Sequence, residues 1–475
     1  PRSTQGVSSA ASDVYKRQVI LTMLFSLTNP EVAILMMGIF LFAVLLGFPI
    51  AFTLMAMGLG FGYYAYFDPT KMEHLFDNRI FQLFVQNTYT VMDNNVLTAV
   101  PLFLFMGYLV ERAGIVAKLF FAIRLASHKL PASMAVAALI TCTLFSTATG
   151  IIGAVVTLMG LLAWPAMVKA GYDKKFASGI ICSGGCLGIL IPPSIMLIVY
   201  SVIAQLSPLR LFAAAIFPGL MLAGLYIGYA VFRAWLNPSI APKPAAEEIP
   251  PPSVIMREVL VSFLPLFSLI ILVLGTILAG IATPAEAAAV GAFGALVLSY
   301  FYKTLKWKNF KESVFLTAKT TAMIMWLFIG SWTFASVFSY LGGHEVFEHF
   351  FKSLNLQPWQ FLVITQIIIF LLGWPLEWTE ILIIFVPIFL PLVEFFGVNP
   401  YFFAMLIALN LQTSFLTPPM AMSAYYLKGV QSKNVELMQI FSGIMPFLGI
   451  VILAMVLMYL FPGIALWLPE TLFAN

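Results

Sequence analysis

Four stretches of this sequence combine helix-breaking residues with polar groups inside otherwise apolar runs. They are residues 146–150, 184–194, 373–380 and 412–423. Pro and Gly interrupt helices, and an interrupted helix presents unpaired carbonyl oxygens, which suit a hard cation such as sodium. The same breaks expose helix N-termini, which favour an anion such as a carboxylate. The sequence therefore predicts paired cation sites beside a site for an organic anion.

The candidate ligands are the hydroxyl, carboxyl and backbone groups of these stretches. For the cation sites, with sodium as the metal, we assign Thr147, Thr149, Gly150, Gly184, Gly185, Gly188, Glu377, Thr379, Thr413, Thr417 and Pro418. For the substrate site we assign Ser183, Pro192, Pro193, Ser194, Ser414 and Pro419. Any one break is also explained as a packing kink, and Ser or Thr also bonds to its own helix. Four breaks in matched pairs favour binding sites.

The composition shows which solvent surrounds these stretches. Of the 475 residues, 61% are hydrophobic and 9% are charged, whereas soluble domains carry about 25% charged residues. Apolar runs long enough to cross a bilayer, roughly 20 residues each, recur between Glu31 and Leu468. We therefore predict an all-α, polytopic, multi-pass membrane protein. The net charge of +4 does not indicate a nucleic-acid partner, and membrane lipid is the expected surrounding.

The chain repeats its own pattern of helix breakers. Pro165, Gly171, Pro192 and Pro193 recur, in the same order and at one constant offset, as Pro391, Gly397, Pro418 and Pro419. Pro218 and Pro446 follow at an offset that is longer by only two positions. We therefore expect a first repeat at 30–236 and a second at 257–470, joined by a proline-rich linker at 237–256. Residues 1–22 are expected to be a non-native or disordered leader.

Each repeat divides into scaffold and transport elements. The predicted scaffold parts are 31–129, with a polar excursion at 68–96, and 258–357. The predicted transport elements are 131–235 and 358–468. Each transport part begins with an interrupted segment, at 131–168 and 358–394, and continues with a broken helix, at 174–204 and 400–427. The interrupted segments enter and leave on one side of the membrane, so we predict re-entrant hairpins.

The charges of equivalent loops predict that the repeats are inverted. Lys169, Lys174 and Lys175 follow the first hairpin, whereas Glu394 follows the second. Basic residues mark the cytoplasmic side, so the two loops face opposite sides. The sequence predicts two inverted structural repeats that hold the four breaks at mid-membrane depth, a pattern typical of transporters.

Acidic residues are scarce in the apolar regions, and an ionisable group in a membrane marks a functional site. Glu377 and Glu380 lie in the second hairpin tip. Glu286 follows Thr283 and Pro284 at a helix start, where a capping role is equally consistent. Glu377 is the better candidate for the site. A membrane-embedded enzyme would need clustered His or acidic groups, so we predict no enzyme and no cofactor.

Several segments resemble one known family in order and spacing. They are GFPIAF at 47–52, VPLFLFMGYLVERAGI at 100–115, GYDKKFASG at 171–179, GGCLGILIPPSIMLIVY at 184–200, ATPAEAAAVGA at 282–292 and NLQTSFLTPPMAMS at 410–423. From about Asn29 onward the chain resembles the large (M) subunit of tripartite ATP-independent periplasmic (TRAP) transporters. The resemblance implies an elevator mechanism, sodium coupling, a bacterial inner-membrane location, a small four-helix Q subunit and a periplasmic substrate-binding protein.

The chain departs from this family at both hairpin tips. Many relatives carry Gly-Ser-Ser at the first tip, where Gly150 is followed here by Ile151 and Ile152. Many carry Phe-Met-Asp-Pro at the second tip, where Glu377 and Trp378 stand here. The resemblance therefore transfers the backbone ligands at 184–188 and 417–419 more safely than the tip side chains. The altered tips look like the branch linked to 2-oxo acids, lactate or mannitol-like solutes.

The expected function is sodium-driven import of a small organic anion delivered by a binding protein. The alternative is a single-component sodium/carboxylate symporter of related inverted-repeat fold, which would need neither the Q subunit nor the binding protein.

Overall fold

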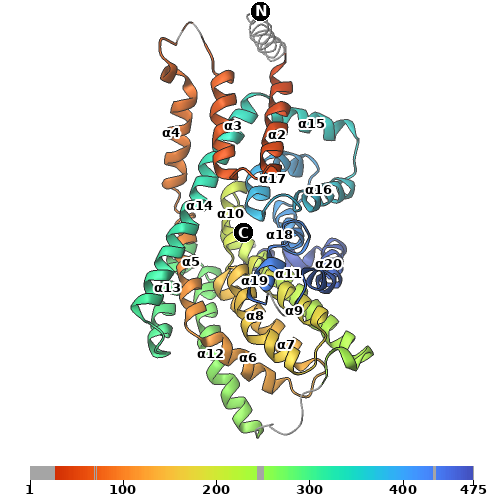
Figure 1. The fold of residues 1–475 in the computed structure, drawn as a ribbon. Helices are drawn as coiled ribbons and strands as arrows, with labels where there is room; N and C mark the ends of the chain where they lie inside the picture. The colour runs from red at the N-terminus through yellow and green to blue at the C-terminus, as the bar shows by residue number, and fades with distance from the viewer. Residues whose placement is uncertain (1–26, 69, 71, 243–250, 432–434, 474–475) are drawn as a thin grey trace, which may run out of the picture. The chain divides into compact units, whose positions relative to one another are not determined.

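The regular structure of the chain is entirely helical over the residues that the computed structural model describes, which are 27–68, 70, 72–242, 251–431 and 435–473 (Figure 1). Seven of these helices are long and apolar enough to cross a membrane, and a bent helix pair meets the same criterion as an eighth. This confirms the predicted all-α, polytopic fold. The expected leader at 1–22 and part of the linker, 243–250, lie outside the described residues.

The helices fall into two compact units, which cut across the two expected repeats. One unit comprises Pro1–Met92 with Trp326–Asn355, and the other comprises Asp93–Met325 with Leu356–Asn475. The division into two inverted repeats with separate scaffold and transport elements remains a prediction.

The first unit is built on close helix contacts. Its elements are α2 (Asn29–Leu45), α3 (Ile50–Ala65), the 3₁₀ helix η1 (Leu75–Asp77), α4 (Arg79–Met92), the C-terminal half of α14 (Trp307–Tyr340) and α15 (Gly343–Ser353). A Cβ added to Gly58 would lie 3.0 Å from Cγ2 of Thr333, and one added to Gly330 would lie 2.7 Å from the carbonyl oxygen of Ala51. Small residues of this kind let membrane helices approach closely.

The polar excursion expected at 68–96 contains a helix, α4, which was not predicted. Its polar residues hide a helical pattern in which Ile80 and Val91 are buried, and Ile80 packs beside Gly62. The stretch from Arg79 to Arg112 holds α4 and α5, and it matches Trp307–Tyr340 at both ends when the halves are aligned by Pro218 and Pro446. The single helix α14 of the second half thus corresponds to two helices in the first half.

The second unit holds all four expected breaks. Its first-half elements are α5 (Ala99–Arg112), α6 (Ile115–Ala126), α7 (Ser133–Thr149), α8 (Ile152–Lys169), α9 (Lys174–Cys186), η2 (Leu187–Ile189), α10 (Ile195–Ala204), α11 (Pro208–Leu236) and η3 (Pro238–Ile240). The others are α12 (Pro252–Leu278), α13 (Pro284–Phe301), the start of α14, α16 (Pro358–Leu372), α17 (Trp378–Phe395), α18 (Pro400–Leu416), α19 (Met422–Val430), α20 (Leu437–Leu460) and α21 (Gly463–Leu472). The order of hairpin, broken helix and closing helix occurs in both halves.

The half-helices after the breaks cross over between the two halves. Helix α10 packs against α17 of the second hairpin, and α19 packs against α8 of the first hairpin. Helices α7, α8 and α9 lie side by side (Figure 1). Each hairpin is therefore held by elements from both halves of the sequence.

Several boundaries differ from those expected. Helix α7 continues to Thr149, α9 to Cys186 and α18 to Leu416, so the breaks shrink to 150–151, 190–194 and 417–421. Ser and Thr are tolerated in these last turns because their hydroxyls donate to carbonyls of the preceding turn. Helix α12 begins at Pro252, inside the expected linker, because Pro suits the first turn of a helix.

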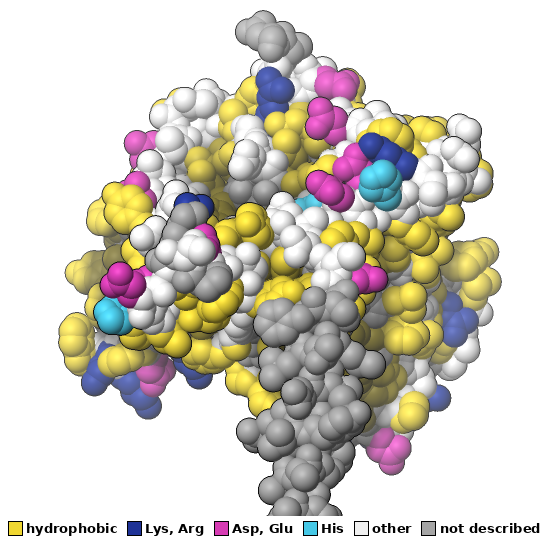
Figure 2. Space-filling view, turned by 90° about the horizontal axis from the view of Figure 1, so that it is seen from above, with side chains coloured by type: hydrophobic (Ala, Val, Ile, Leu, Met, Phe, Trp, Pro, Cys, Tyr) yellow, Lys and Arg dark blue, Asp and Glu magenta, His cyan; other side chains and the backbone are white. Residues whose placement is uncertain are grey.

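The surface agrees with a lipid surrounding. Figure 2 shows hydrophobic side chains over much of one face, with charged side chains in small separate groups. On α12, Met256, Leu260 and Leu264 are all more than half exposed. Such apolar exposure on a long apolar helix is typical of contact with acyl chains.

A buried amide joins the second hairpin to the second broken helix. Nδ2 of Asn410 donates to the carbonyl oxygen of Gln366 at 2.7 Å and to its Oε1 at 2.8 Å. We expect Asn410→Leu to lower the free energy of unfolding by about 1–2 kcal/mol, because Oε1 of the half-buried Gln366 loses its donor in an apolar surrounding. Thermal unfolding of the purified protein measures this loss. The double variant Asn410→Leu/Gln366→Leu should recover most of it; a fully stable single variant would contradict the contact.

Candidate functional site

One cavity in the second unit brings all four breaks together. Its volume is about 320 Å³. The first tip contributes Gly150, Ile151, Ile152 and Gly153, and the second contributes Glu377, Trp378 and Thr379. Ile189 and Ile195 flank the first helix break, and Phe415 and Met422 flank the second. Stretches from both halves of the sequence therefore line one space.

The first tip turns sharply at a glycine. Gly150 ends α7 with φ of +63°, a left-handed conformation that glycine adopts without a steric penalty. Oγ1 of Thr147 donates to the carbonyl oxygen of Thr143 at 2.6 Å, and Oγ1 of Thr149 donates to that of Phe145 at 3.0 Å. Both hydroxyl oxygens keep lone pairs, so these bonds do not exclude cation binding.

The glycines of the first broken helix allow it to pack against the first hairpin. A Cβ added to Gly184 would lie 3.0 Å from Cβ of Cys142. One added to Gly185 would lie 2.3 Å from Cγ2 of Val156. Gly188 faces Ser146 in the same way, at 2.7 Å from its Cβ. The pairing of the first tip with the first break is therefore present, and its glycines serve close packing.

The second half has a similar contact, in which the glycine lies on the hairpin and the serine on the broken helix. A Cβ added to Gly373 would lie 3.0 Å from Cβ of Ser414. Ser414 is the counterpart of Gly188 at the offset that relates Pro192 to Pro418. Thr413 donates to the carbonyl oxygen of Asn410 at 2.7 Å, and Thr417 donates to that of Thr413 at 2.8 Å. The second tip thus pairs with the second break.

Three of the predicted site residues line the cavity directly: Gly150, Glu377 and Thr379. The predicted substrate residues Ser183, Ser194 and Ser414 are buried away from it. Oγ of Ser194 donates to the carbonyl oxygen of Ile189 at 2.5 Å, whereas Oγ of Ser183 has no partner among the described residues. Pro192, Pro193, Pro418 and Pro419 lie in the two breaks, and both Pro-Pro bonds are cis.

The acidic residues of the apolar regions now have defined positions. Glu377 precedes α17 and lines the cavity, and it is the one charged side chain among the described residues that do so. Glu380 is buried in the first turn of the same helix. Glu286 caps α13, since its Oε2 accepts from both N–H and Oγ1 of Thr283 at 2.8 Å. Of the two roles left open for Glu286, the structure supports capping.

The sequence reasoning missed three polar residues of the cavity. They are Tyr108, Thr320 and Tyr426. The hydroxyls of Tyr108 and Thr320 are hydrogen-bonded at 3.2 Å, and the ring of Tyr426 lies against Gly153, 2.9 Å from where its Cβ would be. Tyr426 follows Pro419 at the same spacing at which Tyr200 follows Pro193. This repeated spacing could have identified it.

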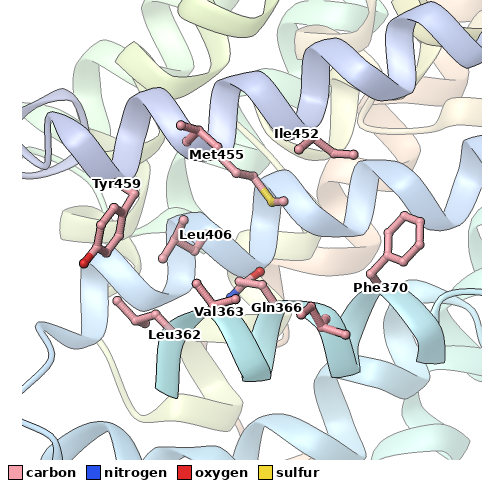
Figure 3. Close-up of a pocket in the computed structure, with 10 residues that line it drawn as sticks. Leu362, Val363, Gln366, Phe370, Leu406, Ile452, Met455 and Tyr459 are labelled. Atoms are coloured by element: carbon pink, nitrogen blue, oxygen red, sulfur yellow. The ribbon is translucent and has the colours of Figure 1, made fainter. Parts of the chain in front are cut away.

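A second hollow lies apart from this cavity. It is an apolar groove of about 350 Å³ between α16, α18 and α20. Figure 3 shows Leu362, Phe370, Met455 and Tyr459 around it, together with the polar side chain of Gln366. The groove contains neither hairpin tip, so the cavity and not the groove is the candidate functional site.

Comparison with solved structures shows the fold. The chain resembles the Alcanivorax borkumensis YdaH transporter, described as having an unusual topology, with a TM-score of 0.58 at 15% identity, covering 91% of this chain and 98% of that one. It also resembles Neisseria gonorrhoeae MtrF, described within a class of antimetabolite efflux pumps, with a TM-score of 0.52 at 14% identity, covering 91% and 94%.

Comparison of sequences shows the family. The DctM component of the tripartite ATP-independent periplasmic transporter matches residues 37–464. The Vibrio cholerae sialic acid TRAP transporter large permease protein SiaM is 30% identical, covering 80% of this chain and 87% of its own length. The Pseudomonas aeruginosa C4-dicarboxylate TRAP transporter large permease protein DctM is 29% identical, covering 81% and 88%. The chain therefore belongs to the DctM family of large permease subunits of tripartite ATP-independent periplasmic transporters, as its motifs predicted.

Proposed function

We propose that this chain is the permease subunit of a sodium-coupled, binding-protein-dependent secondary transporter that imports a small organic acid across the bacterial inner membrane. The observation that carries the proposal is the cavity where two hairpin tips and two broken helices meet. Irregular backbone at membrane depth is tolerated where it lines a cavity, and broken helices hold both ions and solute in transporters.

Sodium suits the donors that surround the cavity. Oγ1 of Thr379, which lines the cavity, is a buried oxygen without a hydrogen-bond partner in the described ranges. No three His, Cys, Asp or Glu side chains cluster to hold a metal in the part of the chain that the structure describes. A hard cation bound by carbonyl and hydroxyl oxygens fits this donor set better than a transition metal does.

The organic anion would sit in the cavity between the tips. Helices α8 and α17 both begin there, at Ile152 and Trp378, and a helix N-terminus favours a carboxylate. Tyr108, Thr320 and Tyr426 add hydroxyls that would bind oxygens of the solute. Small acids such as 2-oxo acids or lactate are the expected class.

The proposed movement is an elevator, in which hairpins and broken helices slide against scaffold helices. Gly107 of α5 supports this division, because a Cβ there would lie 2.6 Å from the carbonyl oxygen of Thr149. The missing side chain lets α5, a proposed scaffold helix, contact the tip through backbone atoms without interlocking side chains. The proposed partners are a four-helix Q subunit and a periplasmic binding protein. A relative from Oleidesulfovibrio alaskensis bears the name isethionate TRAP transporter permease protein DctMQ, and this chain spans 59% of its length.

The test is uptake into proteoliposomes that contain this chain and its Q subunit. Radiolabelled lactate and pyruvate are offered on the cognate binding protein under an inward sodium gradient. We expect uptake to fall at least about tenfold when choline replaces sodium or when the binding protein is left out. Uptake by the chain alone would support the single-component symporter instead. Equal uptake in choline would contradict sodium coupling.

A further inference from the structure

Helix α17, which begins at the second tip, has a capping box whose acceptor is the carboxylate of a buried glutamate. In such a box, the side chain at the third helical position accepts from the backbone N–H that precedes the helix. Gln360 serves this role in α16 and Gln439 in α20, and Glu31 and Glu286 do so at exposed positions. In α17 the acceptor is Glu380, whose Oε2 accepts from the N–H of Glu377 at 2.5 Å.

Glu380 is 6% exposed, and capping alone does not explain why an acid stands at this buried position. An amide would accept the same hydrogen bond without a buried carboxylate, as Gln360 and Gln439 do. Taking a charge out of water is costly unless an opposite charge meets it, and the helix N-terminus offsets only a small part of that cost. An ionised Glu380 would therefore need a positively charged partner, whereas a glutamine at this position would not.

The described helices that pack most closely against α17 within its unit provide no positive charge. Helices α10, α16 and α18 pack against α17, and none of them contains Lys, Arg or His. Arg112, next to the cavity, stacks 6.0 Å from the ring of Tyr108 and lies 3.8 Å and 3.7 Å from carboxylate oxygens of Glu111 and Glu312. Its charge is already engaged by two carboxylates.

A second observation points to a ligand at the same place. Thr379 lies between the two acids, is 2% exposed and lines the cavity together with Glu377. Its Oγ1 has no hydrogen-bond partner within the described residues. Glu380 does not line the cavity itself, but its carboxylate is tied to the backbone of Glu377, which does. An unpartnered hydroxyl and two carboxyl groups within one helical turn supply the oxygen ligands that a hard cation prefers.

The first tip lacks this chemistry. At the offset that relates Pro165 to Pro391, Glu377 corresponds to Ile151 and Glu380 corresponds to Ala154. A cation at the first tip would meet backbone and hydroxyl oxygens alone. We propose that Glu380 supplies the negative charge of a cation site at the second tip, with Thr379 and Glu377, so that the two coupling sites differ in charge and affinity. This inference rests on the proposed function and extends it to unequal sites.

The test measures sodium binding without transport. Protein in lipid nanodiscs is titrated with sodium chloride against choline chloride at constant ionic strength, and both radioactive sodium bound per chain and the melting temperature are recorded. Glu380→Gln keeps the capping acceptor and removes the charge. We expect it to raise the half-saturating sodium concentration of one site at least about tenfold, with the sodium-free melting temperature unchanged or higher.

Glu286→Gln is the matched control, because it makes the same change in an exposed capping box and should leave sodium binding unchanged. Thr379→Val removes the unpaired hydroxyl and keeps the shape, so it should weaken sodium binding about threefold without loss of stability. Sodium binding by Glu380→Gln equal to that of the native chain would overturn the inference and leave the proposed function standing. Absence of sodium binding in the native chain would overturn both.

Discussion

The substitution Gly443→Ala is expected to disrupt the packing of α20 against α9 and to remove most of the folded protein. A Cβ at this position would lie 1.9 Å from the carbonyl oxygen of Lys175, and one at the facing Gly179 would lie 2.1 Å from the carbonyl oxygen of Gly443. Both neighbours are backbone, so neither helix can yield by a rotamer change. The cost should reach about 3 kcal/mol, the upper end for overpacking.

The measurement is the fraction of monodisperse protein in size-exclusion chromatography, together with its melting temperature. Gly449→Ala on the same helix is the matched control, because nothing lies within 4 Å of a Cβ there. Alanine favours a helix over glycine by about 1 kcal/mol, so the control should be as stable as the native chain or more so. Equal stability of the two variants would show that α9 and α20 do not meet as described.

The substitution Gly153→Val is expected to reduce transport strongly, with little effect on folding. The new side chain would meet the ring of Tyr426, whose carbons lie 2.9–3.2 Å from the Cβ position. Tyr426 is 38% exposed, so its ring can move into the cavity of about 320 Å³. The displaced ring then occupies the solute's space. The displaced ring should weaken the binding free energy of the solute by about 1–3 kcal/mol, the usual cost of overpacking. Uptake should then fall about ten- to hundredfold.

Sodium-driven uptake in proteoliposomes measures this effect. The free energy of unfolding should change by less than about 1 kcal/mol, since the clash is with a movable side chain. The double variant Gly153→Val/Tyr426→Ala should regain uptake, because the smaller residue frees the cavity. Gly224→Val on α11, with nothing within 4 Å of its Cβ, should transport normally. Native uptake by Gly153→Val would argue against the cavity as the path of the solute.

Local patterns were sufficient to predict most of the helices and the positions of their breaks. Apolar runs report burial in lipid wherever they occur, and Pro or Gly interrupts a helix whatever surrounds it. The paired breaks around Pro193 and Pro419 therefore appear where the sequence placed them. Helix α4 was not predicted, because its polar side chains outweighed the apolar pattern that includes the buried Ile80 and Val91. The exact helix ends were also not predicted, since hydroxyls such as that of Thr417 bond to carbonyls of the preceding turn, so that helices continue through Ser and Thr residues.

The sequence alone determined three things: the order of helices and breaks along the chain, the membrane environment, and the pairing of each tip with the break that follows it. All three follow from residue types and their spacing along the chain. The makeup of the cavity was decided only by the tertiary structure. Gly153 and Tyr426 lie in opposite halves of the sequence, and no local rule states that α19 crosses to the first hairpin while α10 crosses to the second. Likewise, the sequence placed Glu380 in the second tip, but only the tertiary structure shows that it is buried and that the neighbouring Thr379 hydroxyl has no partner among the described residues. A helix turns its side chains in every direction, and only the packing of distant helices determines which of them face a shared space.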